Sequence, residues 1–210
     1  YNSMMAKFDK ILKPIGDVLV EPEQQKYLSA DAFFWNVTFH EVAHGLGVKQ
    51  TVNGKGSVDE AMGSEKTTWE EGKADILGLF MVCKLIDMGE ITDITKEEAI
   101  ATFITGIVRS VRFGFASSHG KANMMCYNFM EEQGAFTRNA DGRYHIDFEK
   151  SLAAIDTWAN LIITTQATGN YEFAKKYSSE HAKITPALEA DIAKVNGAGI
   201  PRDIRFNFAW

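Results

Sequence analysis

Cysteine and proline are both rare in this chain. Its 210 residues contain two cysteines and four prolines. Cys83 and Cys126 each fall within an apolar helical pattern, which favours small buried thiols over a disulfide, so cysteine does not identify a compartment. The scarcity of proline, together with apolar residues spaced three and four apart, excludes a β-rich protein and predicts a mainly α-helical one.

Excess positive charge and long apolar runs are also missing. The chain contains 22 lysine and arginine residues and 28 aspartate and glutamate residues, which gives a formal net charge of −6. The sequence contains no dense basic cluster. Nucleic acid is therefore not an expected partner. The apolar run at 76–83 is far shorter than the roughly 20 residues that a membrane-spanning helix needs, so no membrane span is expected.

The beginning of the sequence predicts a larger protein. It starts at Tyr1 without an initiator methionine, a charged leader or a signal-type apolar stretch. We expect residues 1–210 to form a single unit of a longer protein, whose N-terminal part precedes Tyr1. An export signal in that part would escape notice, so the compartment stays open, with a soluble, cytoplasmic protein favoured.

Apolar spacing and capping residues predict the order of the elements. A helix is expected over 30–45 with Ser29 or Asp31 as its N-cap, followed by an exposed connection at 49–66. A capping box at Thr67–Glu70 should open the next helix, which Gly89 stops. Thr95 and Glu98 should open a further helix at about 95–113, and more helices are expected at 118–134, 147–168, 171–181 and 186–196. A small β-hairpin is expected within 135–147, and extended or irregular chain at Ile204–Phe208.

The sharpest motif lies inside the first of these helices. Residues His40–His44 read HEVAH, an HExxH sequence, of which a chain with this composition would contain on the order of 0.01 by chance. A separation of four residues places both imidazoles on one helical face, where their nitrogens can converge on one ion at about 2.0–2.1 Å. Glu41 then lies beside the ion, where its carboxylate can accept a proton from a water molecule that the ion acidifies. The plain alternative is a polar, solvated helix face.

A catalytic zinc site also needs a third protein ligand and an open position. The segment Glu70–Asp75 reads EEGKAD and stands in the first turns of the next helix. Glu71 and Asp75 share a face, so Glu71 can bind the metal while Asp75 accepts the free N–H of a ligand histidine. Glu70 lies about 100° around the helix and suits a supporting or substrate-binding role. These acidic residues would also interact favourably with the helix N-terminus in any protein.

These motifs resemble those of the dipeptidyl peptidase III family of metallopeptidases. The likeness rests on HEVAHGLG at 40–47, EEGKAD at 70–75, RFG at 112–114 and SHGKAN at 118–123, and it extends from about Phe8 to Asp147. The sequence is similar above all to family relatives fused to Nudix domains in plants and to bacterial stand-alone homologues. The HExxH and EExxAD pair is the specific part of the resemblance.

The resemblance implies that residues 1–210 form a single zincin-like, mainly helical zinc-binding catalytic lobe. This lobe would close over a cleft against a second lobe, which precedes it in the longer protein. By motif match, His40, His44 and Glu71 would bind one zinc ion, Glu41 would activate water, and Glu70 and Asp75 would orient the ligand histidines. His119 aligns with a histidine that the family places in the cleft to contact substrate and stabilise the transition state. Taken alone, a single histidine at a helix start is more often a cap or a surface residue.

One departure limits what the resemblance implies. Dipeptidyl peptidase III spaces its motif histidines one residue further apart, so its dipeptidyl specificity is not carried over. The sequence predicts a zinc-dependent hydrolase of peptide bonds with a peptide substrate. Two alternatives remain: a lobe that keeps the metal site as a binding or regulatory module, and a hydrolase or isomerase of small molecules. The ligand types also suit cobalt or manganese.

Overall fold

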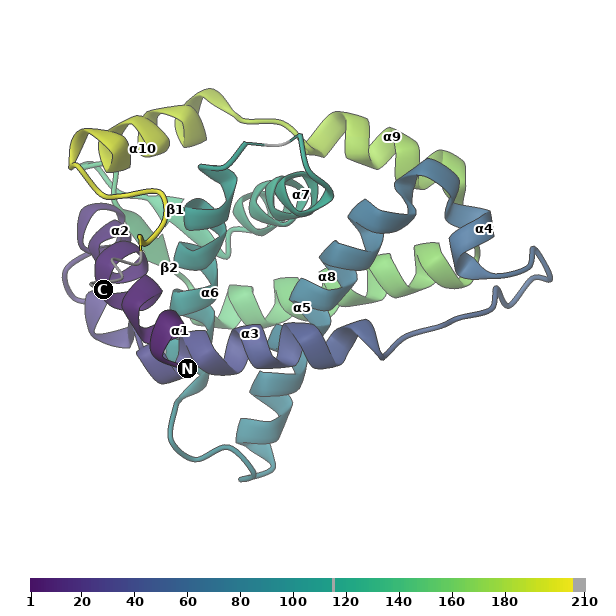
Figure 1. Cartoon of the computed structure of the whole chain (residues 1–210), viewed down its shortest axis with the longest axis horizontal. Helices are drawn as coiled ribbons and strands as arrows, with labels where there is room; N and C mark the ends of the chain where they lie inside the picture. Colours follow the sequence, from purple (N-terminus) through teal and green to yellow (C-terminus); the bar gives the residue numbers. More distant parts are fainter. Residues whose placement is uncertain (115, 206–210) are drawn as a thin grey trace, which may run out of the picture.

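Helix α5 (Lys66–Asp87) runs through the middle of the protein (Figure 1). In the computed structural model, which describes residues 1–114 and 116–205, α5 packs against α3 (Ala30–His44), α7 (Ser118–Glu132) and α8 (Phe148–Ala167). Figure 1 shows α3 lying across α5, with the C-terminal end of α5 and the loop that follows it projecting beyond α3. The predicted mainly α-helical fold class is confirmed.

The remaining elements surround these helices. No helix among the described residues is long and apolar enough to cross a membrane. Phe206–Phe208, part of the expected extended C-terminal segment, lie outside the described residues. The other elements are α1 (Asn2–Lys7), a π-helix (Phe8–Leu12), α2 (Lys13–Leu19), a 3₁₀-helix (Gln25–Tyr27), α4 (Val58–Met62), a 3₁₀-helix (Gly63–Glu65), α6 (Lys96–Val111), β1 (Phe136–Arg138), β2 (Tyr144–Ile146), α9 (Tyr171–His181) and α10 (Pro186–Gly197).

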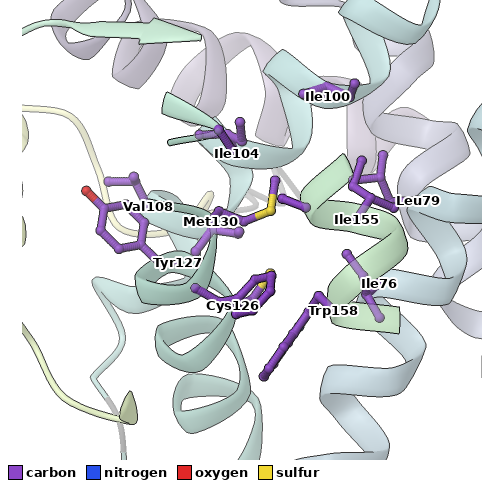
Figure 2. Close-up of a cluster of buried hydrophobic side chains, with 14 of the residues drawn as sticks. Ile76, Leu79, Ile100, Ile104, Val108, Cys126, Tyr127, Met130, Ile155 and Trp158 are labelled. Atoms are coloured by element: carbon purple, nitrogen blue, oxygen red, sulfur yellow. The ribbon is translucent and has the colours of Figure 1, made fainter. Parts of the chain in front are cut away.

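The core forms where apolar stripes of α5, α6, α7 and α8 meet (Figure 2). Each stripe repeats every three or four residues, so burying one face of each helix removes a continuous apolar surface from water. Cys83 and Cys126 are buried free thiols, as the sequence predicts. The labelled members are Ile76 and Leu79 of α5, Ile100, Ile104 and Val108 of α6, Cys126, Tyr127 and Met130 of α7, and Ile155 and Trp158 of α8.

The predicted N-caps at Ser29 and Thr95 are confirmed, and the capping box predicted at Thr67 is wrong. Ser29 caps α3, and Thr95 forms a capping box with Glu98 at the start of α6. The capping box expected at Thr67–Glu70 does not form, because α4 and a 3₁₀-helix already carry the chain as helix into α5. The box instead lies at Ser57, whose hydroxyl accepts from the backbone N–H of Glu60 at 3.2 Å. The connection at 49–66 is therefore partly helical.

The hairpin predicted within 135–147 is present and is tied to α10 by a buried polar network. β1 and β2 pair antiparallel, with Phe136 opposite Ile146. The Tyr144 hydroxyl donates to Asp191 Oδ2 at 2.7 Å, and Arg138 Nη2 donates to the same oxygen at 2.7 Å. Because Asp191 is 1% exposed, both partners compensate for taking its carboxylate out of water.

Candidate metal centre

The site forms where α3 and α5 touch through their backbones. A Cβ atom on Gly78 of α5 would lie 2.8 Å from the backbone nitrogen of His40 on α3, closer than real Cβ contacts. Only glycine permits this approach, so the two helix axes lie unusually near each other at His40. The face of α5 that carries Glu71 and Asp75 therefore meets the face of α3 that carries the two motif histidines.

Three potential ligand atoms form a small triangle between the helices. His40 Nε2 lies 3.2 Å from His44 Nε2 and 3.5 Å from Glu71 Oε2, and His44 Nε2 lies 3.8 Å from Glu71 Oε2. A triangle of this size has a point about 2.0 Å from all three corners, which is the zinc–ligand distance. Two ligands of a tetrahedral zinc ion stand about 3.3 Å apart, a distance that the two shorter sides approach and the side of 3.8 Å between His44 and Glu71 exceeds.

Carboxylates hold the outer nitrogens of both histidines. His40 Nδ1 lies 2.6 Å from Asp75 Oδ1, and His44 Nδ1 lies 3.2 Å from Glu70 Oε1. A carboxylate at Nδ1 places the proton there and leaves the Nε2 lone pair directed at the centre of the triangle, as in carboxylate–histidine–metal groups. The structure thus brings together Glu70 and Asp75 with the histidines that the sequence analysis assigned to them.

The surroundings of the Glu71 carboxylate test whether a cation fits this site. Its Oε2 atom is buried and accepts no hydrogen bond of good geometry from a described residue, although His119 Nε2 lies 2.9 Å away. A buried carboxylate oxygen without a donor is costly, and here it faces imidazole nitrogens that are themselves metal-ligand types. The donor set of two imidazoles and one carboxylate is the composition of catalytic zinc sites, so these residues fit a zinc ion.

His119 offers a second combination around the same carboxylate. Ligand atoms of His40, Glu71 and His119 all lie within 4.8 Å of one another, and the rings of His40 and His119 stack at 6.0 Å. The His119 side chain is 63% exposed, whereas that of His44 is 33% exposed. Among the described residues, no hydrogen bond orients His119 Nδ1, while Glu70 orients His44. Among the described residues, the group completed by His44 therefore has a carboxylate at the outer nitrogen of each histidine, whereas the group completed by His119 has one at His40 alone.

The electrostatics of His40 follow from its burial and its acidic neighbours. Burial lowers the pKa of His40, but the hydrogen bond with Asp75 and the charges of Asp75, Glu71 and Glu41 outweigh burial and raise the pKa above its ordinary value. Acidic neighbours that favour the imidazolium also favour a metal cation at the same place. Protons and metal therefore compete for this position.

Glu41 lies beside this centre on the open side of α3. It is exposed and lines a cavity of about 280 Å³ together with His40, Asp75 and His119. The side chains of this cavity come from α1, α3, α5, α6 and α7. Glu41 thus reaches the space into which a ligand of the metal centre would extend, without belonging to the triangle itself.

The two remaining histidines lie away from the site. His145 Nδ1 lies 2.7 Å from Glu21 Oε2 on the surface, and the ring of His181 stacks on Tyr177 at 3.9 Å. The sequence analysis missed two nearby cations, Lys73 and Arg109. Lys73 stands within EEGKAD, where a lysine between acidic residues reads as a surface residue, and Arg109 reaches the cavity only through the packing of α6.

The fold and the site define a mainly α-helical lobe with a His/Glu group suited to a metal ion. Dipeptidyl peptidase III structures from Caldithrix abyssi and from Corallococcus sp. strain EGB superpose on 97% of this chain with a TM-score of 0.91 each, at 32% and 30% sequence identity. Nudix hydrolase 3 of Arabidopsis thaliana is 31% identical over 99% of this chain. No protein-family model matches the chain.

The chain is related to the dipeptidyl peptidase III family and corresponds to one part of its longer chains. It spans 39% and 38% of the two dipeptidyl peptidase III structures and 27% of Nudix hydrolase 3. The resemblance seen in the sequence motifs is thereby confirmed.

Proposed function

We propose that this chain is the zinc-binding lobe of a metallopeptidase that hydrolyses peptide bonds. The observation that carries the proposal is the triangle of His40 Nε2, His44 Nε2 and Glu71 Oε2, whose sides of 3.2–3.8 Å suit one zinc ion. The relation to dipeptidyl peptidase III structures supports the same reaction class.

Each residue of the site has a defined task in this reaction. Zinc, when bound, supplies a Lewis acid that polarises the scissile carbonyl and acidifies water. Glu41 takes a proton from the attacking water and passes it to the leaving amine, because its exposed carboxylate lines the cavity beside His40. Asp75 and Glu70 hold the histidine rings in the tautomer that presents Nε2.

His119 acts on the substrate at the rim of the site. Its Nε2 lies 2.9 Å from Glu71 Oε2, so it stands within reach of a substrate carbonyl that lies beside this carboxylate. An imidazole N–H at that place can donate to the oxyanion that develops as the carbonyl is attacked. Its exposure leaves it free to turn toward the substrate.

The test combines metal content with turnover. We expect the chain to bind about one zinc ion, measured by elemental analysis, and we expect Glu41→Gln to retain that zinc. Within the natural protein that carries this chain, the zinc-loaded form should cleave members of a mixed peptide library, and Glu41→Gln should lower the rate by at least about 100-fold.

Two results would contradict the proposal. Absence of zinc under replete conditions would remove the metal centre. Zinc binding without cleavage of any peptide, with Glu41→Gln indistinguishable from the parent, would favour a lobe that keeps the metal as a binding or regulatory module.

A further inference from the structure

The cavity beside the metal centre contains an arginine without an anionic partner. Arg109 stands near the C-terminal end of α6 and lines the same cavity as His40 and Glu41. Among the described residues, its guanidinium makes no ion pair and no hydrogen bond, and its Nε atom is buried without an acceptor. A guanidinium has five N–H donors, so this one retains its whole capacity for an anion.

The surroundings of Arg109 explain why the unpaired cation is costly. Burial lowers the pKa of Arg109, and the negative charge of Asp203 opposes that effect without an ion pair between the two side chains. Arg109 is half-buried, and a charge that is partly removed from water is stabilised by a partner. Arg112, the C-cap residue of α6, shows the contrast, because it donates to Asn196 Oδ1 and to the backbone oxygens of Ile200 and Pro201.

The charges of the cavity are divided between two groups of residues. The acidic side chains, Glu41 and Asp75, belong to the metal centre, and Asp75 is engaged by His40. The cationic side chains, Lys7 of α1 and Arg109 of α6, lie on the other elements of the cavity wall. A ligand that places a carbonyl at the metal centre and a carboxylate near Arg109 would match both groups.

The size of the cavity restricts such a ligand. Its volume of about 280 Å³ lies just below the range of about 300–1,000 Å³ that small-molecule sites occupy. A short peptide segment fits this space, whereas a folded protein surface does not. Asn36 lines the same space and its buried Oδ1 has no donor among the described residues, so the wall can also accept an N–H.

We propose that Arg109 binds a carboxylate of the substrate and thereby selects anionic short peptides for the metal centre. The carboxylate is either the C-terminus of the peptide or an acidic side chain next to the scissile bond. Guanidinium–carboxylate pairs are charge-assisted and often bidentate, which gives orientation as well as affinity. This inference rests on the proposed peptidase function, because it names the substrate class of the same site.

The experiment measures binding rather than turnover. Zinc-loaded protein carrying Glu41→Gln, which cannot consume the peptide, is titrated by calorimetry with three probes: Ala-Ala-Ala as the free acid, Ala-Ala-Ala amide, and Ala-Glu-Ala amide. We expect at least one carboxylate-bearing probe to bind about 10-fold or more tightly than Ala-Ala-Ala amide. Preference for the free acid alone identifies the C-terminus, and preference for Ala-Glu-Ala amide identifies an acidic side chain.

Variants assign the preference to Arg109. Arg109→Met should abolish it, Arg109→Lys should retain part of it because the charge remains, and Lys121→Met is the matched control. Lys121 is exposed on α7 two residues beyond His119 and does not line the cavity, so its loss should leave the preference intact. Circular dichroism and the melting temperature of each variant show whether it folds like the parent.

The inference is overturned if all three probes bind the zinc-loaded Glu41→Gln protein with equal affinity. This result does not require any Arg109 variant to fold. It is also overturned if the preference survives in a folded Arg109→Met variant. Glu41-dependent hydrolysis without a carboxylate preference would reject the role of Arg109 and leave the peptidase function standing. A carboxylate preference without hydrolysis in the natural protein would reject the peptidase function alone.

Discussion

Lys73 Nζ lies 2.7 Å from Glu70 Oε1, the oxygen that also meets His44 Nδ1 at 3.2 Å. Lys73 is 2% exposed, and its ammonium donates in addition to the backbone oxygen of Leu46 at 2.7 Å. A buried lysine therefore joins the end of α3 to the carboxylate that orients a predicted metal ligand.

This contact predicts that Lys73 tunes the metal centre. Lys73→Met preserves the buried stem but leaves Glu70 free to rotate away from His44, so we expect zinc affinity to fall by about 10–100-fold. Competition with a chromophoric chelator measures the affinity. Lys84→Met, an exposed change on the same helix, is the control and should leave the affinity unchanged. Equal affinities for Lys73→Met and the parent would limit the lysine to a structural role.

The two candidate third ligands should separate by mutation. We expect His44→Ala to lower zinc affinity by at least about 100-fold, because it removes a nitrogen that Glu70 orients toward the centre. His119→Ala should lower it by less than about 10-fold, since its ring is largely exposed and lacks outer support. The reverse order would transfer the ligand role to His119 and move His44 to the rim.

The contact between α3 and α5 predicts opposite results for two glycines of one helix. Gly78→Ala would force a methyl group to within 2.8 Å of backbone on α3, so it should cost about 1–3 kcal/mol of unfolding free energy and weaken zinc binding. Gly72→Ala places its methyl 3.4 Å from Ile162 Cδ1, a contact that a flexible side chain can relieve. It should be neutral or stabilise α5 by up to about 1 kcal/mol. Urea denaturation of both variants measures the difference, and similar costs would disprove the close approach.

The buried network behind the hairpin predicts a large stability loss at one carboxylate. Asp191→Ala leaves the Arg138 guanidinium and the Tyr144 hydroxyl without their shared acceptor, so we expect a cost of about 3–5 kcal/mol. Glu189→Ala, an exposed change on the same helix, should lie within about 0.5 kcal/mol of the parent. Thermal unfolding followed by circular dichroism compares them. A small effect at Asp191 would show that water replaces the lost partner.

Burial of Cys83 predicts a thiol that does not react in the folded protein. Burial raises the pKa of Cys83 to about 12, and the ordinary thiol pKa is about 8.5. The stabilisation from the neutral thiol is complete below about pH 8.5 and declines as the pH rises toward 12, because only the unfolded chain ionises there. At pH 8, a disulfide reagent should label the native protein at least about 100-fold more slowly than the guanidinium-unfolded protein. Rapid native labelling would require an open path to the thiol.

The sequence predicted the parts of the site that depend on local geometry. Spacing of four residues on one helix relates His40 to His44 and Glu71 to Asp75, and helical periodicity alone places each pair on one face. The sequence also predicts that Asp75 meets a ligand histidine of the other helix, and the structure identifies that histidine as His40. The metal itself, and the roles of Glu41 and His119 in a reaction, stay predictions.

Other features depend on tertiary packing that no local pattern encodes. The sequence analysis assigns no individual helices before residue 30. It also misplaces the start of α5, because Thr67 and Glu70 have the spacing of a capping box but lie inside a helix that begins at Lys66. Arg109 could not be recognised, since only the packing of α6 beside α3 brings it to the metal centre's cavity. Lys73 was hidden for the same reason, because burial of a lysine depends on its partners in space.

The glycine contact at His40 has a consequence for how the protein would behave without metal. Direct backbone packing at Gly78 and the large apolar core hold both helices that carry the triangle, so we expect the arrangement of these helices not to depend on an ion. Binding then requires little ordering of the chain, unlike small zinc domains that fold only around their metal. Removal of the ion by a chelator should therefore leave the helical circular dichroism spectrum unchanged. The ion would then contribute to the reaction and not to the folding of the chain.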